Sequence, residues 1–187
     1  MGRVSKEQAQ ENRRRIVGTA SRLFREQGTD GVSVADLMKA AGLTHGGFYK
    51  HFDSKEALVD EATARAFDGA EEQRVASTGA HDGDPEAALR EFVDDYLSPE
   101  HRDDMAGGCP TAGLAVDMAR GAAGSAARYT YTEGVRAFAR QMAGDDEADD
   151  GLARLSTMVG AVILARAVHG DPLSDALLAA ARAEVSR

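Results

Sequence analysis

The chain has 187 residues, a net charge of −9 and a single cysteine, Cys109. This length suffices for one full-sized core, or for a small module joined to a larger one. One cysteine excludes an internal disulfide and therefore a disulfide-stapled secreted scaffold. The longest apolar run, residues 158–165, is far shorter than the roughly 20 residues that cross a bilayer. The polar, basic start of the chain has no signal-peptide core, so we expect a cytoplasmic protein with no membrane partner.

Charge is distributed unevenly along the chain. Residues 1–56 contain 10 Lys and Arg against 7 Asp and Glu, a net charge of +3. Residues 57–187 contain 12 against 24, a net charge of −12. A basic leading module on an acidic body can bind phosphates through one face while the remainder repels them. The asymmetry therefore favours a nucleic-acid contact that is confined to the N-terminal part.

The first elements are predicted to be helices, and no stretch of the chain alternates like a strand. Apolar residues recur every three or four positions on the first helix: Ile16, Ala20, Leu23 and Phe24. This helix should end near Gly28. Ser33, with Asp36 three residues later, predicts a capped start for a second helix that ends at Gly42. Because the next helix follows at Leu43 almost without a linker, the pattern predicts a helix-turn-helix.

The third predicted helix contains two adjacent glycines, Gly46 and Gly47, each of which costs about 1 kcal/mol relative to alanine. Phe48 and Phe52 are four residues apart and should anchor one face inward. The glycines and Lys50 then lie on the opposite face, where bare backbone lets a second surface approach closely. Since the major groove of DNA admits a helix, we interpret this face as a DNA-binding surface.

The side chains around the glycines are of the types that contact bases and phosphates in DNA: Thr44, His45, Tyr49, Lys50 and His51. One alternative is that the glycines mark a loop beside ordinary core aromatics. Another is a metal site made by His45 and His51, but these histidines do not share a helix face and no further ligand completes the set. We therefore predict neither a metal nor a cofactor.

Later helices are expected from a start at Asp53 or Ser54, and from Asp84-Pro85 to Ser98-Pro99. The remaining predicted helices are 111–120, 124–143, 149–169 and 174–185. Loops are expected at 77–84 and 105–110, and the acidic run 145–150 is interpreted as a solvated loop rather than a cation site. The whole chain is thus predicted to be all-α, with about nine helices.

These features resemble the DNA-binding domain of the TetR family of bacterial transcriptional regulators over residues of about 10–58. The matching residues are Ala20, Phe24, Gly28, Gly31, Val34, Leu37, Ala41-Gly42-Leu43, Phe48-Tyr49, Phe52, Ser54-Lys55-Glu56 and Leu58. The resemblance implies an N-terminal three-helix helix-turn-helix DNA-binding domain, residues 1–58. It also implies a larger helical ligand-binding and dimerisation domain, residues 59–187.

Roles for individual residues also follow from the resemblance. Tyr49 and Lys55 match positions that grip phosphate, and Ser33 and Val34 match positions near the DNA backbone at the start of the second helix. The two adjacent glycines depart from the family pattern, in which side chains at these positions often help to read the sequence. How much sequence specificity the third helix supplies is therefore left open.

Two features of the acidic part suggest further sites. Residues 158–165 are apolar nearly all round, and the last helix has an apolar stripe made of Leu177, Leu178, Ala181 and Val185. We predict a homodimer through these last two helices; the alternative is that both are internal core helices. Cys109, in a Gly-Gly-Cys-Pro sequence before a helix, resembles the Gly-Cys element of a TetR subgroup that senses electrophiles or oxidants. An inert packing role for Cys109 remains open, and Tyr129 is a candidate pocket residue.

The sequence therefore predicts a ligand-responsive DNA-binding transcriptional regulator rather than an enzyme. We expect a repressor that binds a palindromic double-stranded DNA operator as a dimer and is released by a small-molecule or electrophile inducer. The alternatives are a small-molecule-modifying enzyme and a helical protein–protein adaptor. The enzyme alternative lacks a nucleophile with a base, because His81, His101 and His169 stand in unrelated sequence contexts.

Overall fold

The computed structural model describes residues 6–78, 84–143 and 151–186. In these ranges the chain forms ten α-helices and one 3₁₀ helix and contains no strand, which confirms the all-α prediction. None of these helices has both the length and the apolar character needed to span a bilayer. The acidic run 145–150 and most of the loop predicted at 77–84 lie outside the described residues.

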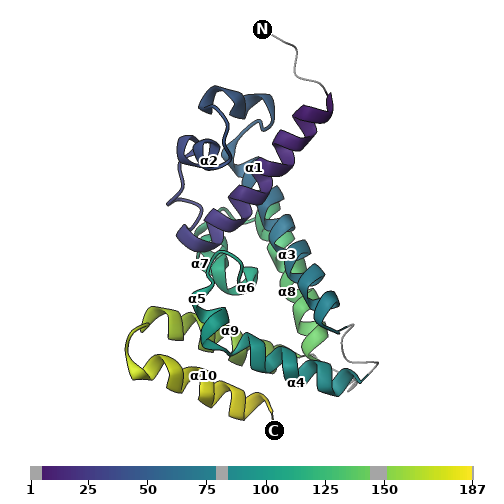
Figure 1. The fold of residues 1–187 in the computed structure, drawn as a ribbon, viewed down its shortest axis with the longest axis vertical. Coiled ribbons are helices and arrows are strands. Elements are labelled where there is room, and N and C mark those ends of the chain that lie inside the picture. Colours follow the sequence, from purple (N-terminus) through teal and green to yellow (C-terminus); the bar gives the residue numbers. More distant parts are fainter. Residues whose placement is uncertain (1–5, 79–83, 144–150, 187) are drawn as a thin grey trace.

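The N-terminal elements form one end of the molecule (Figure 1). They are α1 (Lys6–Gln27), α2 (Val34–Ala40), the 3₁₀ helix η1 (His45–Lys50) and the start of α3 (Lys55–Thr78). The long α3 runs away from this end beside α8 (Ala126–Met142). The antiparallel pair α9 (Leu152–Ala167) and α10 (Pro172–Val185) forms the opposite end. The helix α4 (Pro85–Tyr96) lies at this same end and contacts α10. Three short helices lie between the two ends: α5 (Pro99–Asp103), α6 (Pro110–Gly113) and α7 (Ala115–Arg120).

Most helix ends follow the capping signals of the sequence. The hydroxyl of Ser33 accepts the backbone N–H of Asp36 at 3.1 Å, and the carboxylate of Asp84 accepts that of Ala87 at 3.0 Å. Gly28, with φ of 76°, ends α1 in the left-handed conformation that glycine adopts without strain. The predicted end of the first helix and the predicted start of the second are thereby confirmed.

Three elements differ from the prediction. The third helix is a 3₁₀ helix, because two adjacent glycines weaken the α-helical state. The helix predicted at 111–120 is broken at Leu114 into α6 and α7, which accounts for one of the two extra helices. Ser98-Pro99 does more than end α4, since Ser98 caps the short helix α5 by accepting the N–H of His101 at 3.1 Å.

One hydrophobic core joins the N-terminal end to the body. Phe24, Leu37 and Phe48 are buried in it with at most 2% exposure. The same core includes Leu114 and Met118 from the body. The boundary predicted near residue 58 therefore crosses a shared core, and it stays a prediction.

Polar contacts fix the geometry of the same junction. The guanidinium of Arg25 in α1 donates to the backbone oxygens of Gly107 and Gly108, at 3.2 and 2.7 Å. The backbone N–H and the hydroxyl of Thr29 both donate to Oδ1 of Asp117 in α7, at 2.6 and 2.7 Å. The end of α1 and the loop that follows it are thus held against the body, each at one point.

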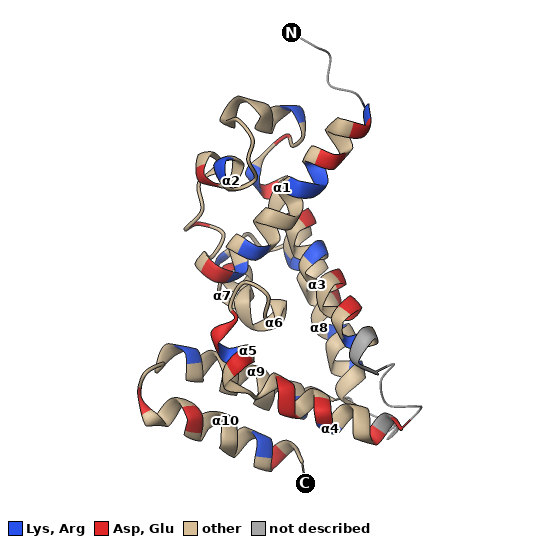
Figure 2. Ribbon diagram, in the orientation of Figure 1, with Lys and Arg blue, Asp and Glu red and all other residues tan. Residues whose placement is uncertain are grey.

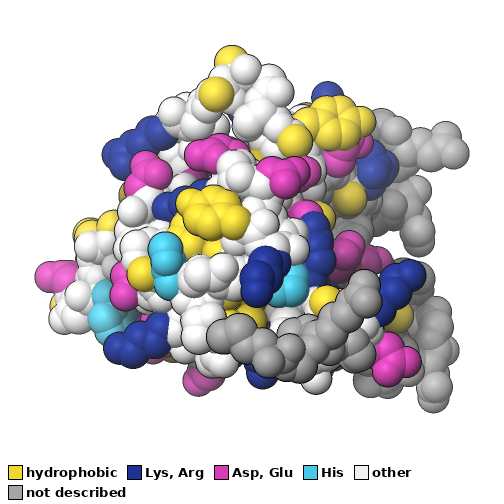
Figure 3. All heavy atoms as spheres, turned by 90° about the horizontal axis from the view of Figure 1, so that it is seen from above, with side chains coloured by type: hydrophobic (Ala, Val, Ile, Leu, Met, Phe, Trp, Pro, Cys, Tyr) yellow, Lys and Arg dark blue, Asp and Glu magenta, His cyan; other side chains and the backbone are white. Residues whose placement is uncertain are grey.

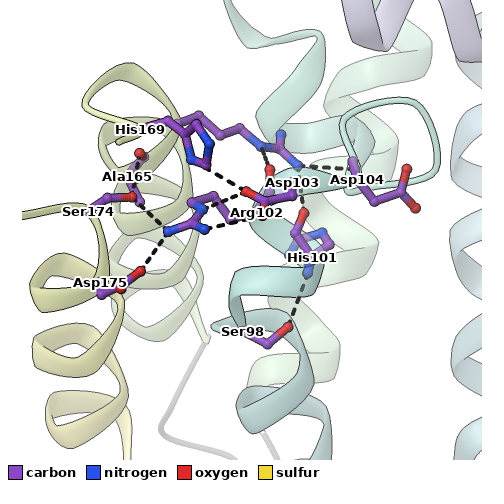
Figure 4. Close-up of polar contacts among 10 residues, drawn as sticks. Ser98, His101, Arg102, Asp103, Asp104, Ala165, His169, Ser174 and Asp175 are labelled. Carbon is purple, nitrogen blue, oxygen red and sulfur yellow. Dashed lines mark hydrogen bonds and ion pairs between the residues drawn. The ribbon is translucent and has the colours of Figure 1, made fainter. Parts of the chain in front are cut away.

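A cluster around Arg102 fixes α5 to the α9–α10 pair (Figure 4). Arg102 is buried and donates to the hydroxyl of Ser174 at 3.0 Å and to the carboxylate of Asp175 at 2.6 Å. Arg166 of α9 donates to the backbone oxygens of Arg102 at 2.8 Å and His101 at 3.0 Å. Two arginines therefore hold the short α5 in a fixed position relative to both C-terminal helices.

Phe48 and Tyr49 offer a direct test of this packing, because they are neighbours on η1 with opposite exposures, 0% and 68%. Phe48→Ala should lower the free energy of unfolding by about 3–5 kcal/mol, since it leaves a cavity in the shared core. Tyr49→Ala should change it by less than about 1 kcal/mol. Urea denaturation measures both values. Equal losses in the two variants would contradict the orientation of η1.

Candidate nucleic-acid interface and ligand cavity

η1 separates a buried aromatic face from an open face. Phe48 and Phe52 are 0% and 3% exposed, and their ring centroids are 5.6 Å apart. On the other side Tyr49 and Lys50 are exposed. A Cβ atom built on Gly46 meets nothing within 4 Å, so the backbone at this position borders open space. The aromatic anchors, Lys50 and Gly46 lie on the predicted faces, although the helix type differs. Gly47 does not, because a Cβ atom there would lie 3.6 Å from Cε of the buried Met38.

The residues predicted to contact DNA all belong to the α2, η1 and α3 end of the molecule, and all are at least partly exposed: Ser33, Val34, Thr44, His45, Gly46, Gly47, Tyr49, Lys50, His51 and Lys55. The elements that carry them lie together at one end in Figure 1. The fold thus brings together positions that span more than twenty residues of sequence. None of them is fully buried, although Val34 also packs against the core.

Charges of both signs occur at this end. Figure 3, which looks onto it, shows Lys and Arg side chains interspersed with carboxylates and histidines. Two of the carboxylates are bound at helix starts. The carboxylate of Asp36 accepts a hydrogen bond from the hydroxyl of Ser33 at 2.6 Å. The carboxylate of Glu56 accepts hydrogen bonds from the backbone N–H of Glu56 and from Ser54, which lower the pKa of Glu56. In Figure 2 further carboxylates recur along α3 and α4, away from η1. The acidic body and the mixed N-terminal end are therefore spatially distinct.

The ionisation of His51 and the pairing of Arg13 are set by their neighbours. Burial, followed by the charges of Arg13 and Lys50, lowers the pKa of His51, so this side chain is predominantly neutral at pH 7. Arg13 forms an ion pair with Glu61, with Nη2 and Oε1 at 2.6 Å, and lies 4.5 Å from the Phe52 ring centroid. Arg13 therefore ties α1 to α3. No local sequence signal pairs two residues this far apart.

A cavity of about 670 Å³ lies among α3, α4, α8 and the connection that contains Cys109. Aromatic side chains form much of its wall: Phe67, Phe92, Tyr96 and Phe138. Asp68, Glu71 and Asp95 also border it. Its size is typical of cavities that enclose small organic molecules.

Cys109 lies in the wall of this cavity and is 9% exposed. Its backbone N–H donates to Nε2 of His101 at 3.1 Å, so this nitrogen carries no proton. Nδ1 of His101 therefore carries the proton and donates to the backbone oxygen of Tyr96 at 2.7 Å. Burial lowers the pKa of His101 and favours this neutral form. With both ring nitrogens bonded, His101 is a positioning group for the cavity wall rather than a free base.

The glycines before Cys109 are required by close backbone contacts. A Cβ atom on Gly108 would lie 2.4 Å from the backbone oxygen of Asp104 and 2.7 Å from Nη2 of Arg166. Such distances are too short for any other residue without movement of the chain. The bonds from Arg25 hold the same glycines on their outer side. The connection is thus fixed between α1 and the cavity.

Two predictions about this region need correction. Tyr129 is 70% exposed and lies outside the cavity wall, because it occupies the outer face of α8. Tyr131, two positions later, points inward instead: its hydroxyl donates to the backbone oxygen of Thr111 at 2.7 Å, and its ring packs on Phe67. The helix that follows Cys109 has only four residues, rather than the ten-residue helix predicted. The sequence also gave no sign that Tyr96 and Thr111 share a wall.

Comparison with known proteins is consistent with this geometry. The family described as bacterial regulatory proteins, tetR family, matches residues 16–62. The HTH-type transcriptional regulator AcrR of Shigella flexneri is 37% identical over 93 residues, which are 50% of this chain and 43% of AcrR. The chain thus matches less than half the length of this curated relative.

Solved structures match over nearly the whole chain. A TetR transcriptional regulator from Chloroflexus aurantiacus has a TM-score of 0.76 and 27% identity, covering 96% of this chain and 94% of that protein. The reduced form of Escherichia coli NemR has a TM-score of 0.77 at 18% identity, with 94% and 95% covered. The latter similarity concerns the fold alone. The protein therefore resembles the TetR family of regulators in its N-terminal helix-turn-helix region, on a fold shared with solved members of that family.

Proposed function

We propose that the protein is a ligand-responsive transcriptional repressor that binds double-stranded DNA through the α2–η1 end. The observation that carries this proposal is the open backbone at Gly46 beside exposed Tyr49 and Lys50, on a helix-turn-helix whose aromatic anchors face inward. Open backbone lets η1 approach base edges closely in the major groove. The names of the curated relatives describe transcriptional regulators, and support comes from the matched half of the chain.

Each residue predicted to contact DNA has a role in the proposal. Lys50 and His45 contact base edges or phosphates, whereas Thr44, Tyr49, His51 and Lys55 contact phosphates. Ser33 and Val34 approach the DNA backbone at the start of α2, and Gly46 and Gly47 allow the close approach. Selection of bound fragments from a random pool of double-stranded DNA tests this function. Failure to enrich any sequence favours the enzyme or the adaptor alternative.

The variants Lys50→Ala and Tyr49→Ala should each weaken binding to the selected DNA by about tenfold or more at physiological salt, since a base or phosphate contact is lost. If Lys50 contacts a phosphate, the slope of log K against log salt concentration should also become shallower by about one in Lys50→Ala. Arg90→Ala, which removes one exposed positive charge on α4, is the matched control and should bind normally. Wild-type affinity in both test variants would contradict the assigned surface.

Gly46→Ala isolates the role of bare backbone. A methyl group at this position meets no other atom within 4 Å, so the free energy of unfolding should stay the same or rise. Binding to the selected DNA should nevertheless weaken, because the methyl group stands between η1 and the base edges. Gly18→Ala, also free of contacts but on α1, is the control. DNA affinity that stays unchanged in Gly46→Ala would refute the close-approach argument.

We further propose that the protein is a homodimer through the outer face of α9 and α10. Leu164 and Leu173 are 54% and 52% exposed there, and Gly160 has open space where a Cβ would be. The stripe predicted on the last helix lies largely on the other side, since Leu178 and Ala181 are buried against the protein's own core. A two-fold axis through the outer face would place two η1 helices for a palindromic operator.

The variant Leu164→Glu should shift the protein from twice the chain mass to the chain mass of 19.7 kDa in sedimentation equilibrium, because it would place a carboxylate in an apolar interface. Val116→Glu introduces the same charge at a 52% exposed position on α7 and should stay dimeric. A dimeric Leu164→Glu variant, or a monomeric wild type, would exclude this interface.

We propose that an inducer releases the DNA by moving the wall of the cavity. The connection at Gly107 and Gly108 borders the cavity on one side and bonds to Arg25 of α1 on the other. A ligand that displaces this connection weakens the bonds to α1 and so alters the position of η1. It shifts the equilibrium only by the difference between its affinities for the two arrangements.

Cys109 is the proposed site for electrophilic inducers. N-ethylmaleimide should add once: the sulfur bonds to an alkene carbon, the C=C π bond breaks, and the thiol proton ends on the neighbouring carbon. Mass spectrometry should show one adduct, and the modified protein should lose affinity for the selected DNA. Cys109→Ser should show neither change. If N-ethylmaleimide released DNA from the serine variant, or if the modified wild-type protein bound DNA with full affinity, Cys109 would not have this role.

A further inference from the structure

Two buried hydroxyl groups of the cavity wall have no hydrogen-bond partner among the residues that the structure describes. They belong to Tyr96 and Thr111, whose side chains are each 5% exposed. Burial raises the pKa of Tyr96, and the neighbouring Cys109 adds to this shift, but a thiol is a weak hydrogen-bond partner. An unpaired buried hydroxyl is costly. These two groups are therefore poised to bond to an occupant of the cavity.

Three rings of the same wall form an aromatic cluster whose planes are inclined to one another, by 37°, 89° and 55°. The centroids of Phe92, Tyr96 and Phe138 are separated by 5.8, 5.8 and 5.7 Å. The Tyr96 ring also packs on the His101 ring at 4.5 Å. Such surfaces favour planar aromatic ligands, which gain from stacked or edge-to-face contacts.

Charge around the cavity disfavours an ionised ligand. Three carboxylates, Asp68, Glu71 and Asp95, border it and repel anions. Arg74 also borders it and is bonded to Glu71. Near the two hydroxyls, His101 is neutral, while Arg25 and Arg166 donate to backbone oxygens. Arg25 and Arg166 keep their positive charge in these bonds, so a cationic group would be repelled at that end, as an anionic group would be by the three carboxylates.

We propose that the cavity binds an uncharged aromatic compound with a carbonyl oxygen that accepts hydrogen bonds from Tyr96 and Thr111. This compound would be the inducer, and only that role rests on the proposed function. A carbonyl oxygen has two lone pairs, so it can accept from either hydroxyl or from both. The aromatic part of the ligand packs on Phe92 and Phe138, and the volume of 670 Å³ accommodates two or three fused rings.

Four probes with one ring system test this class: 2-acetylnaphthalene, 2-ethylnaphthalene, 2-naphthoate and trimethyl-2-naphthylammonium. Isothermal titration calorimetry with the full chain, in the absence of DNA, measures each Kd. We expect the acetyl probe to bind about tenfold more tightly than the ethyl probe, since it gains the two hydrogen bonds. Both ionic probes should bind more weakly than the acetyl probe. Tightest binding of the cation would instead indicate an aromatic cation site and overturn the proposal, as would tightest binding of naphthoate.

Variants assign the preference to the two hydroxyls. Tyr96→Phe and Thr111→Val should each reduce the ratio of ethyl to acetyl Kd, and the double variant should bring it near one. Thermal unfolding should show that both single variants are folded, because each loses only an unpaired hydroxyl. Tyr129→Phe, the same change at a 70% exposed position on α8, should keep the full ratio.

Other outcomes would overturn the proposal. These are equal binding of the acetyl and ethyl probes, a ratio unaffected in the folded double variant, or no binding of any probe at millimolar concentration. The titrations need no DNA, so they separate this inference from the proposed function. Failure of DNA selection with an intact acetyl preference would refute the regulator, whereas selected DNA without that preference would refute only the ligand class.

Discussion

The bond between Arg25 and two successive glycine oxygens is the contact on which the organisation of this molecule depends. Arg25 belongs to α1, and its partners Gly107 and Gly108 belong to the wall of the cavity. One guanidinium nitrogen, Nη1, can hold both oxygens because it carries two N–H donors. The glycines in turn can approach because any side chain at Gly108 would collide with Asp104 and Arg166. The bonds from Arg25 and the glycines that permit them together couple one end of the protein to its interior.

Apolar packing supports the same coupling. Leu114 and Met118 of the body lie in one core with Phe24 and Phe48 of the N-terminal end. A continuous core transmits displacement, because close-packed side chains have few alternative arrangements. A second core holds α4, α8, α9 and α10 together around the cavity. The cavity thus lies between a core that reaches η1 and a core that reaches the C-terminal pair.

Local features of the fold could be predicted from the sequence because their causes are local. Capping by Ser33, the stop at Gly28 and the burial of Phe48 and Phe52 all follow from residues within a turn or two. The break at Leu114 was missed, since apolar spacing continues unchanged through it.

The cavity itself could be predicted only in outline. Its wall combines residues from α3, α4, α8 and the connection before α6, and periodicity does not say which helix faces meet. Tyr129 and Tyr131 are two positions apart, and only the observed packing of α8 on α3 decides that Tyr131 is the inward one. The bonds from Arg25 join residues 82 and 83 positions apart, for which no sequence pattern exists.

The position of α5 has a consequence for how two subunits would respond to a ligand. Arg102 and Arg166 bind this short helix to α9 and α10, the helices of the proposed interface, while His101 in the same helix supports the cavity wall. Filling one cavity would therefore alter the shared two-fold surface, and the second subunit would encounter its ligand with a changed affinity. Saturation of such a pair follows a curve whose steepness differs from that of two independent sites.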